Sequence, residues 1–204
     1  DIKQFSDVEF IASSVNKGYS GGNNFGINKA LHDGADLIFI LNPDTEIEKD
    51  TISNLAEGME KYNADIAGPK IYFTDSKKIW YAGGIFDMAN VIGKHRGVDE
   101  EDKGQYNKPV ETDFASGAAI MIKREVFEKI GLFDEKYFLY YEDSDFCLRA
   151  KKAGFKIMYS PEAVVCHANA KTTGLGSPVQ DYYITRNRML FAAKFLPLRT
   201  RLAL

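Results

Sequence analysis

Hydrophobic and polar positions in the first 70 residues alternate between short apolar runs and longer stretches with apolar residues three or four apart. The short runs predict strands, and the longer stretches predict amphipathic helices. The run at 37–41 shows no alternation, which is typical of a strand buried on both faces. The predicted elements are strands at 8–12, 37–41 and 65–69, a helix from Phe25 that ends near Gly34, and a helix at 48–62. Alternating strands and helices predict an α/β layer fold.

The pattern changes after residue 70. Apolar segments at 80–86 and 91–93 predict short strands, and 97–108 reads as a polar surface loop, so we expect a β-rich insertion with a loop over about residues 71–111. The remaining predicted strands are 118–122, 155–159 and 163–166, and the remaining helices are 124–130, 142–153 and about 179–195. Gly131 and Gly154 stand where two of these helices should end.

Composition narrows the class of protein. The 204 residues are 45% hydrophobic and 27% charged, which predicts a globular chain, and we expect one domain over 1–204 with a helical segment at about 178–204. The 26 basic and 29 acidic residues are spread along the chain, which argues against nucleic acid as a partner. The apolar run at 37–41 is far shorter than the roughly 20 residues that span a membrane. Two cysteines, Cys147 and Cys166, indicate a reducing, cytoplasmic compartment, although one bridge between them stays open.

The first candidate for chemistry is Asp44, which follows a predicted strand together with Asn42. Ligands of α/β sheets bind beyond the carboxyl ends of strands, and an aspartate there can hold a divalent cation against a diphosphate. The alternative is an Asx turn in which Asp44 caps the following helix. The motif alone does not decide between them.

A glycine-rich stretch follows the first predicted strand and contains Gly18, Gly21, Gly22 and Gly26. Such a loop lets the backbone approach a ligand closely, whereas the plainer interpretation is a flexible turn between a strand and a helix. The stretch has neither the Gly-x-Gly-x-x-Gly spacing of a dinucleotide site nor the ending of a P-loop.

Three carboxylates, Glu142, Asp143 and Asp145, stand where a helix should begin. Acidic residues at that position often only complement the helix dipole. The aromatic stretch at 133–141 lies just before them, and burial against it would raise a carboxyl pKa toward the value of a general base. His167 ends a predicted strand, where it either completes a metal site or is structural.

In chain order, these residues form a series of motifs. The series resembles glycosyltransferase family 2, and more narrowly its rhamnosyltransferase-like branch, over about residues 8–194. The motifs are Asn16-x-Gly18-x-x-Gly21-Gly22-Asn23, Asn42-Pro43-Asp44, Ser116-Gly117, Gly131-x-Phe133-Asp134, Glu142-Asp143-x-Asp145 and His167.

The resemblance implies an α/β fold of the GT-A type, with three layers and a mixed central sheet. It also implies a divalent cation, Mn²⁺ or Mg²⁺, and inversion at the anomeric carbon. Asp44 matches the last aspartate of the family's metal motif and Asn42 replaces the first one, so Asp44 is the expected direct ligand. His167 matches a histidine that joins the metal, and Asp143 matches the general base.

The resemblance further implies a UDP- or dTDP-sugar as donor and a saccharide or lipid-linked acceptor in polysaccharide or glycoconjugate synthesis. Glu142 and Asp145 would contact the acceptor or support the base. The remaining residues would bind the donor: Asn16, Gly21, Gly22 and Asn23 near the nucleotide, Asn42 near the metal, and Ser116 and Gly117 along the sugar. The chain begins after the family's first strand, loop and helix, so we expect the nucleotide-binding start to be missing.

Two other functions stay open at this point. A non-catalytic fragment of the same fold would bind a sugar or a partner chain without turnover. A sugar-phosphate nucleotidyltransferase also uses metal-bound aspartates, but it needs a basic glycine-rich loop that Lys17 alone does not supply. The last helix mixes Arg186 and Arg188 with Met189 and Phe191, which predicts either packing on the core or contact with the inner face of the membrane.

Overall fold

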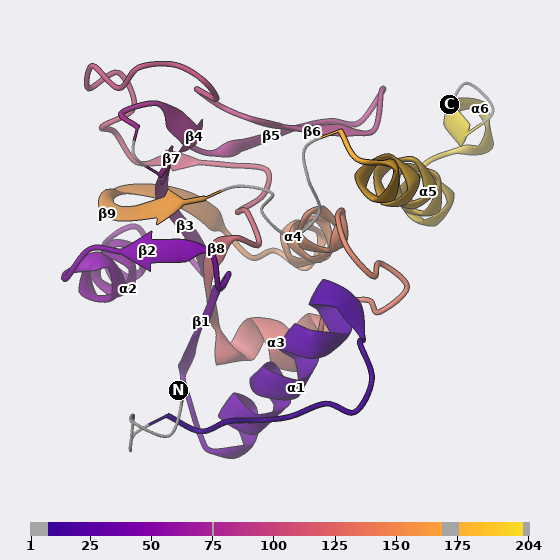
Figure 1. Ribbon diagram of the computed structural model, residues 1–204, viewed down its shortest axis with the longest axis horizontal. Coiled ribbons are helices and arrows are strands. Elements are labelled where there is room, and N and C mark those ends of the chain that lie inside the picture. Colours follow the sequence, from indigo (N-terminus) through magenta and orange to yellow (C-terminus); the bar gives the residue numbers. More distant parts are fainter. Residues whose placement is uncertain (1–7, 75, 169–175, 202–204) are drawn as a thin grey trace.

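The computed structural model describes residues 8–74, 76–168 and 176–201, without the side chain of residue 200 (Figure 1). Its central sheet has the strand order β1-β8-β3-β9-β2, with β4 added beside β3 and β7 beside β9. The strands of this sheet are β1 (Leu37–Leu41), β2 (Thr45–Ile47), β3 (Ile66–Phe73), β4 (Ile79–Tyr81), β7 (Val110–Glu111), β8 (Ala119–Lys123) and β9 (Ile157–His167). The strands β5 (Gly84–Asp87) and β6 (Ile92–His95) form a separate antiparallel hairpin.

The central sheet is mixed, as expected. The strands β3 and β9 are parallel, and the pairs β1–β8 and β3–β8 are antiparallel. It follows that β1, β3 and β9 run in one direction and β8 in the other. The carboxyl ends of β1 and β9 therefore lie at the same edge of the sheet as the amino end of β8. This edge positions the candidate site.

Helices cover both faces of the sheet and make three layers (Figure 1). The helix α2 (Thr51–Lys61) packs Leu55 and Met59 against one face. The other face carries α1 (Gly18–His32), α3 (Arg124–Ile130) and α4 (Glu142–Lys152), which contribute Ile27, Phe127 and Phe146 to the main core. Side chains alternate across a strand, so Met121 packs toward α2 while its neighbours Ile120 and Ile122 pack toward the other helices.

The chain continues into α5 (Pro178–Phe195) and the short α6 (Leu198–Arg201). Phe191 of α5 is fully buried and contacts Phe86 of the β5–β6 hairpin, with ring centroids 4.7 Å apart. Arg188 donates two hydrogen bonds to the carbonyl oxygen of Asn90 in the turn of that hairpin. The helix α5 is therefore packed on the β5–β6 hairpin. No helix of the described residues has the length and apolar character to cross a membrane.

The strand predicted at 8–12 was wrong. These residues pair with no strand of the described chain, and Val8 and Phe10 are 56% and 67% exposed. An apolar run becomes a strand only where a neighbouring strand accepts its backbone hydrogen bonds, and the local sequence does not reveal that neighbour. The strand at 37–41 was right, but its burial on both faces was not. In the described sheet β1 stands at the end of the strand order, and Leu37 and Leu41 are partly exposed.

Three boundaries differ from expectation. The predicted glycine loop is the first turn of α1, which begins at Gly18. The strands predicted at 155–159 and 163–166 are one strand, β9, whose register with β3 shifts between Pro69 and Lys70. The expected insertion is partly joined to the central sheet through β4 and β7. Cys147 and Cys166 form no disulfide with each other.

Candidate active site

A cavity of about 720 Å³ opens at the sheet edge where β1 and β9 end. Its lining combines residues from strand ends, from the start of α4, from the β5–β6 hairpin and from α5. The residues of the sequence motifs that line it are Asn42, Pro43, Asp44, Ser116, Gly117, Glu142, Asp143 and His167. Motif residues spread over 126 positions, from 42 to 167, thus meet around one volume.

Asp44 lies beside His167. Oδ1 of Asp44 is 3.2 Å from Nε2 of His167, because Thr45 on β2 pairs with His167 on β9. The turn before β2 is closed by Thr45, whose hydroxyl donates to the carbonyl oxygen of Asn42 over 2.6 Å. The helix-cap alternative for Asp44 was wrong, since α2 begins only at Thr51 with Asp50 as its N-cap residue.

The imidazole of His167 is enclosed. It is 5% exposed and lies edge-on to Trp80, with ring centroids 4.5 Å apart. Burial lowers its pKa, while the neighbouring carboxylate of Asp44 acts in the opposite direction. Its Nδ1 is buried and has no hydrogen-bond partner among the described residues. Burial therefore favours the neutral ring, which is the form that can bind a metal ion.

Asp143 is held by backbone donors. The amide of Gly117 donates to Oδ2 over 3.1 Å, and the amide of Ser144 donates to Oδ1 over 2.6 Å. Burial raises the pKa of Asp143, and these hydrogen bonds act in the opposite direction. The hydroxyl of Tyr19 donates to the carbonyl oxygen of Gly117 over 2.5 Å and so fixes the residue that holds the carboxylate. Burial raises the affinity of this carboxylate for a proton, which suits a general base.

Glu142 is more enclosed than its neighbour. The residue is 5% exposed, and its Oε2 has no hydrogen-bond partner among the described residues. Burial raises the pKa of Glu142 well above its usual range, and the charge of Asp143 raises it further. The neutral acid is therefore the favoured form of Glu142 in the folded protein.

We expect Glu142→Gln to stabilise the protein at pH 8. Because the pKa of Glu142 is raised on folding, the folded state binds more protons than the unfolded state between the two pKa values, and stability falls as pH rises through that window. Glutamine cannot ionise, so the variant should melt at a higher temperature than the parent at pH 8. Near pH 3, where the glutamate is almost fully protonated in both states, the difference should vanish because the usual glutamate pKa is about 4.3. Calorimetric melting at both pH values checks this, and a variant less stable at pH 8 would contradict it.

The backbone just before α4 is strained. Tyr140 and Tyr141 have φ angles of +67° and +72°, in the left-handed region that side chains rarely adopt. Asn187 of α5 lies behind this turn and is fully buried. Its amide nitrogen donates to the carbonyl oxygens of Leu139 and Tyr140 over 2.7 and 2.8 Å. A side chain 47 and 48 residues further along the chain than these carbonyl groups thus holds the turn that leads into Glu142 and Asp143, two residues of the cavity lining.

The first turn of α1 holds the preceding residues. The amide of Tyr19 donates to the carbonyl oxygen of Phe138 over 2.7 Å, and the hydroxyl of Ser20 donates to that of Tyr137. Gly18 has φ +67°, and a Cβ there would lie 2.1 Å from the carbonyl oxygen of Phe138. A glycine is therefore needed at residue 18 because the backbone of Phe138 lies where a side chain would begin.

The other residues of the glycine motif lie away from the cavity. Asn16 accepts a hydrogen bond from the amide of Gly18 over 2.9 Å, and the amide nitrogen of Asn23 donates to the carbonyl oxygen of Tyr19. Gly21 and Gly22 lie within α1. None of the four expected donor-binding residues Asn16, Gly21, Gly22 and Asn23 lines the cavity. Their contacts begin and stabilise a helix.

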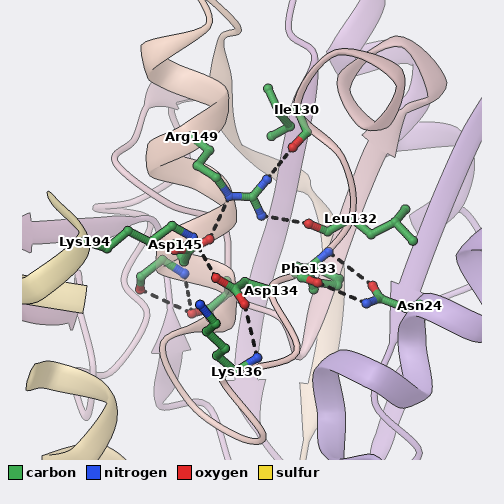
Figure 2. Close-up of polar contacts among 11 residues, drawn as sticks. Asn24, Ile130, Leu132, Phe133, Asp134, Lys136, Asp145, Arg149 and Lys194 are labelled. Carbon is green, nitrogen blue, oxygen red and sulfur yellow. Dashed lines mark hydrogen bonds and ion pairs between the residues drawn. The ribbon is translucent and has the colours of Figure 1, made fainter. Parts of the chain in front are cut away.

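Asp145 does not line the cavity, and its polar contacts are drawn in Figure 2. Its side chain is fully buried and pairs with Arg149 over 2.7 Å and with Lys194 of α5 over 2.6 Å. Arg149 in turn donates to the carbonyl oxygens of Ile130 and Leu132. This network joins α4, α5 and the end of α3, so the position of Asp145 agrees with a supporting role and not with contact to an acceptor.

Several cavity residues were not expected from the sequence. Tyr19 was placed in the glycine-rich loop, Trp80 and His95 in the β-rich insertion, and Arg188 in a helix that packs on the core or contacts the membrane, yet all four line the cavity. The aromatic residues of the insertion were the only sequence signal for these positions, because a tryptophan and a histidine on short strands are compatible with the lining of a binding cavity. Nothing in the local sequence pattern indicated that Trp80 and His95 line the same cavity as Asp143.

The residues present fit a divalent cation in part. Among residues 8–74, 76–168 and 176–201, no three histidine, cysteine or acidic side chains come together as a complete metal site. Asp44 and His167 form a pair whose ligand atoms lie 3.2 Å apart. Two neighbouring ligands of an octahedral ion at about 2.1 Å are separated by about 3 Å, so this spacing suits a shared cation. A diphosphate would supply further oxygen ligands.

Comparison with known families agrees with the motifs. The family described as "Glycosyl transferase family 2" matches residues 1–131, and "Glycosyltransferase like family 2" matches residues 94–189. The chain belongs to glycosyltransferase family 2. This membership leaves the nucleotidyltransferase alternative without support.

The curated relatives include rhamnosyltransferases. The chain is 33% identical to the low-salt glycan biosynthesis hexosyltransferase Agl10 of Haloferax volcanii, over 90% of this chain and 60% of the relative. It is 31% identical to the dTDP-rhamnosyl transferase RfbF of Shigella flexneri, over 95% of this chain and 66% of the relative. It is 25% identical to the N-acetylglucosaminyl-diphospho-decaprenol L-rhamnosyltransferase of Mycobacterium tuberculosis, over 85% and 62%. The chain therefore spans about 60–66% of the length of these relatives.

Solved structures bear out the fold. A structure of GalNAc-T7 with UDP, GalNAc and Mn²⁺ matches with a TM-score of 0.60 at 18% identity, over 77% of this chain and 31% of that one. A mannosyltransferase of Pyrobaculum calidifontis in complex with GDP-Man and Mn²⁺ matches with a TM-score of 0.53 at 14% identity, over 85% and 44%. The expected GT-A fold is thus confirmed for this family 2 member.

Proposed function

We propose that this chain is the catalytic domain of an inverting glycosyltransferase, which moves a sugar from a nucleotide-diphosphate donor to an acceptor hydroxyl. The observation that carries the proposal is one cavity of about 720 Å³ that holds the Asp44–His167 pair and a half-buried Asp143 fixed by backbone hydrogen bonds. The first group suits a metal-bound diphosphate and the second suits a base. A transferase of this class needs both at one centre.

On the donor side, Asp44 and His167 would hold the divalent cation, Mn²⁺ or Mg²⁺. A bound cation neutralises the charge that develops on the departing diphosphate. Asn42 lies on the turn that contains Asp44, and its backbone N–H donates a 2.9 Å hydrogen bond to the carbonyl oxygen of Ala118. We place the donor sugar along Ser116 and Gly117, where a Cβ at residue 117 would lie 2.7 Å from the hydroxyl oxygen of Tyr19.

On the acceptor side, Asp143 would take the proton from the attacking hydroxyl. The acceptor oxygen then forms its bond to the anomeric carbon while the bond from that carbon to the diphosphate oxygen breaks, and configuration inverts in a single displacement. The raised pKa of Asp143 favours this transfer, since a base works best when its pKa approaches the operating pH. We expect Glu142, next to it, to contact the acceptor as a neutral acid.

The relatives suggest the substrates. Two of them are named for rhamnose transfer, one with dTDP in its name and one with an N-acetylglucosaminyl-diphospho-decaprenol acceptor. We therefore propose a dTDP- or UDP-activated hexose or deoxyhexose and a saccharide or lipid-linked acceptor. The basic residues of α5 add little support to membrane contact, because Arg186, Arg188 and Lys194 bond to groups of the molecule itself.

Calorimetric titration of the chain with dTDP and with UDP, each with and without Mn²⁺, tests the proposal. We expect one nucleotide to bind only when the cation is present. If neither nucleotide binds under any condition, the chain is a non-catalytic member of its family or needs a further part to bind its donor, and the proposed activity of this chain is wrong.

We expect Asn187 to act as a positioning residue, which gives a prediction with a matched control. Asn187→Leu removes the two hydrogen bonds to the carbonyl oxygens of Leu139 and Tyr140, and this should cost about 2 kcal/mol of stability. Asn24→Leu is the control, because Asn24 makes two similar hydrogen bonds to the backbone of Phe133, away from the cavity (Figure 2). Both variants should lose comparable stability. Only Asn187→Leu should also lower kcat, by tenfold or more relative to the parent. An equal loss of kcat in both variants would show a purely structural role.

A further inference from the structure

Trp80 and His95 form a wall of the cavity that the proposed function does not use. Trp80 lies on β4, His95 ends β6, and both line the cavity. Their ring centroids are 4.4 Å apart with the planes at 71°. Trp80 also contacts His167, so this wall adjoins the pair that we assign to the donor diphosphate. A ligand that extends from the diphosphate therefore reaches the wall directly.

The hydrogen bond of His95 determines which ring nitrogen carries the proton. Nδ1 lies 3.0 Å from the carbonyl oxygen of Trp80. A carbonyl oxygen can only accept, so Nδ1 is the donor. The ring packs among Trp80, Tyr81 and Phe114, and no carboxylate of the described residues forms an ion pair with it.

A ring in these surroundings is neutral. Burial lowers the pKa of His95 to about 4, against the effect of its bond to Trp80. Nε2 then carries a lone pair, and no group of the described residues donates a hydrogen bond to it. Trp80 and His95 both line the cavity, so this part of the lining combines an indole ring with an imidazole whose Nε2 can accept a hydrogen bond.

This combination matches a pyranose ring. A sugar has hydroxyl groups that donate hydrogen bonds and faces of C–H groups that pack on aromatic rings, and binding pockets combine apolar walls with a few placed polar atoms. We propose that Trp80 and His95 form a sugar subsite in which Nε2 of His95 accepts a hydrogen bond from a hydroxyl of the bound sugar. The inference rests on the proposed function in taking a sugar as the ligand. That sugar is either the transferred group of the donor or the terminal residue of the acceptor.

Two substitutions at one position separate this role from a structural one. His95→Asn keeps a donor close to the place of Nδ1 and removes the acceptor at Nε2. His95→Gln places an amide oxygen close to Nε2 and removes the donor to the carbonyl of Trp80. A sugar subsite predicts that the asparagine variant binds sugar about 3- to 10-fold more weakly than the parent, with the glutamine variant in between. A purely structural role predicts the opposite order.

Saturation-transfer NMR with Mg²⁺ measures binding in two arms. The donor arm compares dTDP-L-rhamnose with dTDP, and the acceptor arm uses the methyl β-glycoside of N-acetylglucosamine. The predicted order of the variants in the first arm assigns the subsite to the donor sugar, and in the second arm to the acceptor. Equal binding of all three proteins, a greater loss in His95→Gln, or no sugar-dependent binding in either arm would overturn the inference.

The dTDP titration reports separately on the proposed function. If dTDP does not bind but the glycoside distinguishes the variants in the predicted order, the donor assignment fails and the subsite stands. If dTDP binds and the variants do not differ in either arm, the subsite fails and the donor site stands.

Discussion

Asp143→Asn should lower kcat by about 10²- to 10⁴-fold, which is the usual contribution of a general base. Asparagine has nearly the same shape and its single amide oxygen can keep one of the two backbone hydrogen bonds, from Gly117 or from Ser144, so we expect the fold around α4 to persist. It cannot take a proton from the acceptor at neutral pH. The loss should therefore appear in kcat, with the affinity for nucleotide and Mn²⁺ unchanged. The measurement is the rate of dTDP release from dTDP-L-rhamnose with Mn²⁺ and a saccharide acceptor, the methyl β-glycoside of N-acetylglucosamine.

The pH profile gives an independent check on Asp143. Burial raises the pKa of this carboxyl, and only the deprotonated form can act as a base. The kcat of the parent should therefore rise with pH through an ionisation above the usual range of aspartate, and this ionisation should be absent from the Asp143→Asn variant. A variant that keeps both its rate and its ionisation would exclude Asp143 as the base.

Asp44→Asn should weaken cation-dependent binding of the nucleotide by at least about 100-fold. Loss of a group that only supports a metal ligand costs 10- to 100-fold in metal affinity, and Asp44 is proposed to bind the cation directly. The substitution removes the charge but keeps the shape of the turn that begins at Asn42 and is closed by Thr45. Calorimetric titration with dTDP, with and without Mn²⁺, measures the loss.

Asp50→Asn is the matched control for this prediction. Asp50 lies six residues further along, is exposed, and makes no side-chain hydrogen bond as the N-cap residue of α2. The substitution Asp50→Asn removes the same charge from the same region of the chain, at a residue that does not line the cavity. If both variants bind the nucleotide as the parent does, the Asp44–His167 pair does not hold the cation. If both variants lose binding to the same extent, the effect comes from net charge.

Tertiary contacts also decide which electrostatic properties the carboxylates have. The run Glu142-Asp143-x-Asp145 looks uniform in sequence, yet each residue meets a different environment. Asp145 is paired with Arg149 and Lys194, Asp143 accepts backbone hydrogen bonds, and Glu142 is buried with an oxygen that has no hydrogen-bond partner among the described residues. Three similar side chains in four positions therefore support three different assignments.

The glycine motif shows a limit of reading residues by type. Glycines near the start of a helix suggested a backbone cradle for a ligand, but Gly18 is required by the close approach of Phe138. No sequence pattern distinguishes a glycine that admits a ligand from one that admits another part of the chain. Both need the same conformational freedom.

The sequence by itself determined the strands β1, β3 and β8, the helices α2 to α5, the glycines that end α3 and α4, and the polar residues that follow β1 and end β9. These features depend on local propensity and on the spacing of apolar residues, which act over a few positions. The motif series also identified the family, because the order of several short motifs is specific even when each one is not. The mixed sheet and the GT-A fold followed from that resemblance.

Only the tertiary structure decided that residues 8–12 pair with no described strand, that Trp80 and His95 face the same cavity as Asp143, and that Asn187 holds the turn before α4. Each of these outcomes depends on groups that are tens of residues apart in sequence. Burial, a raised pKa and a hydrogen bond between distant elements are set by what packs around a side chain, and that neighbourhood exists only once the sheet and its helices have come together.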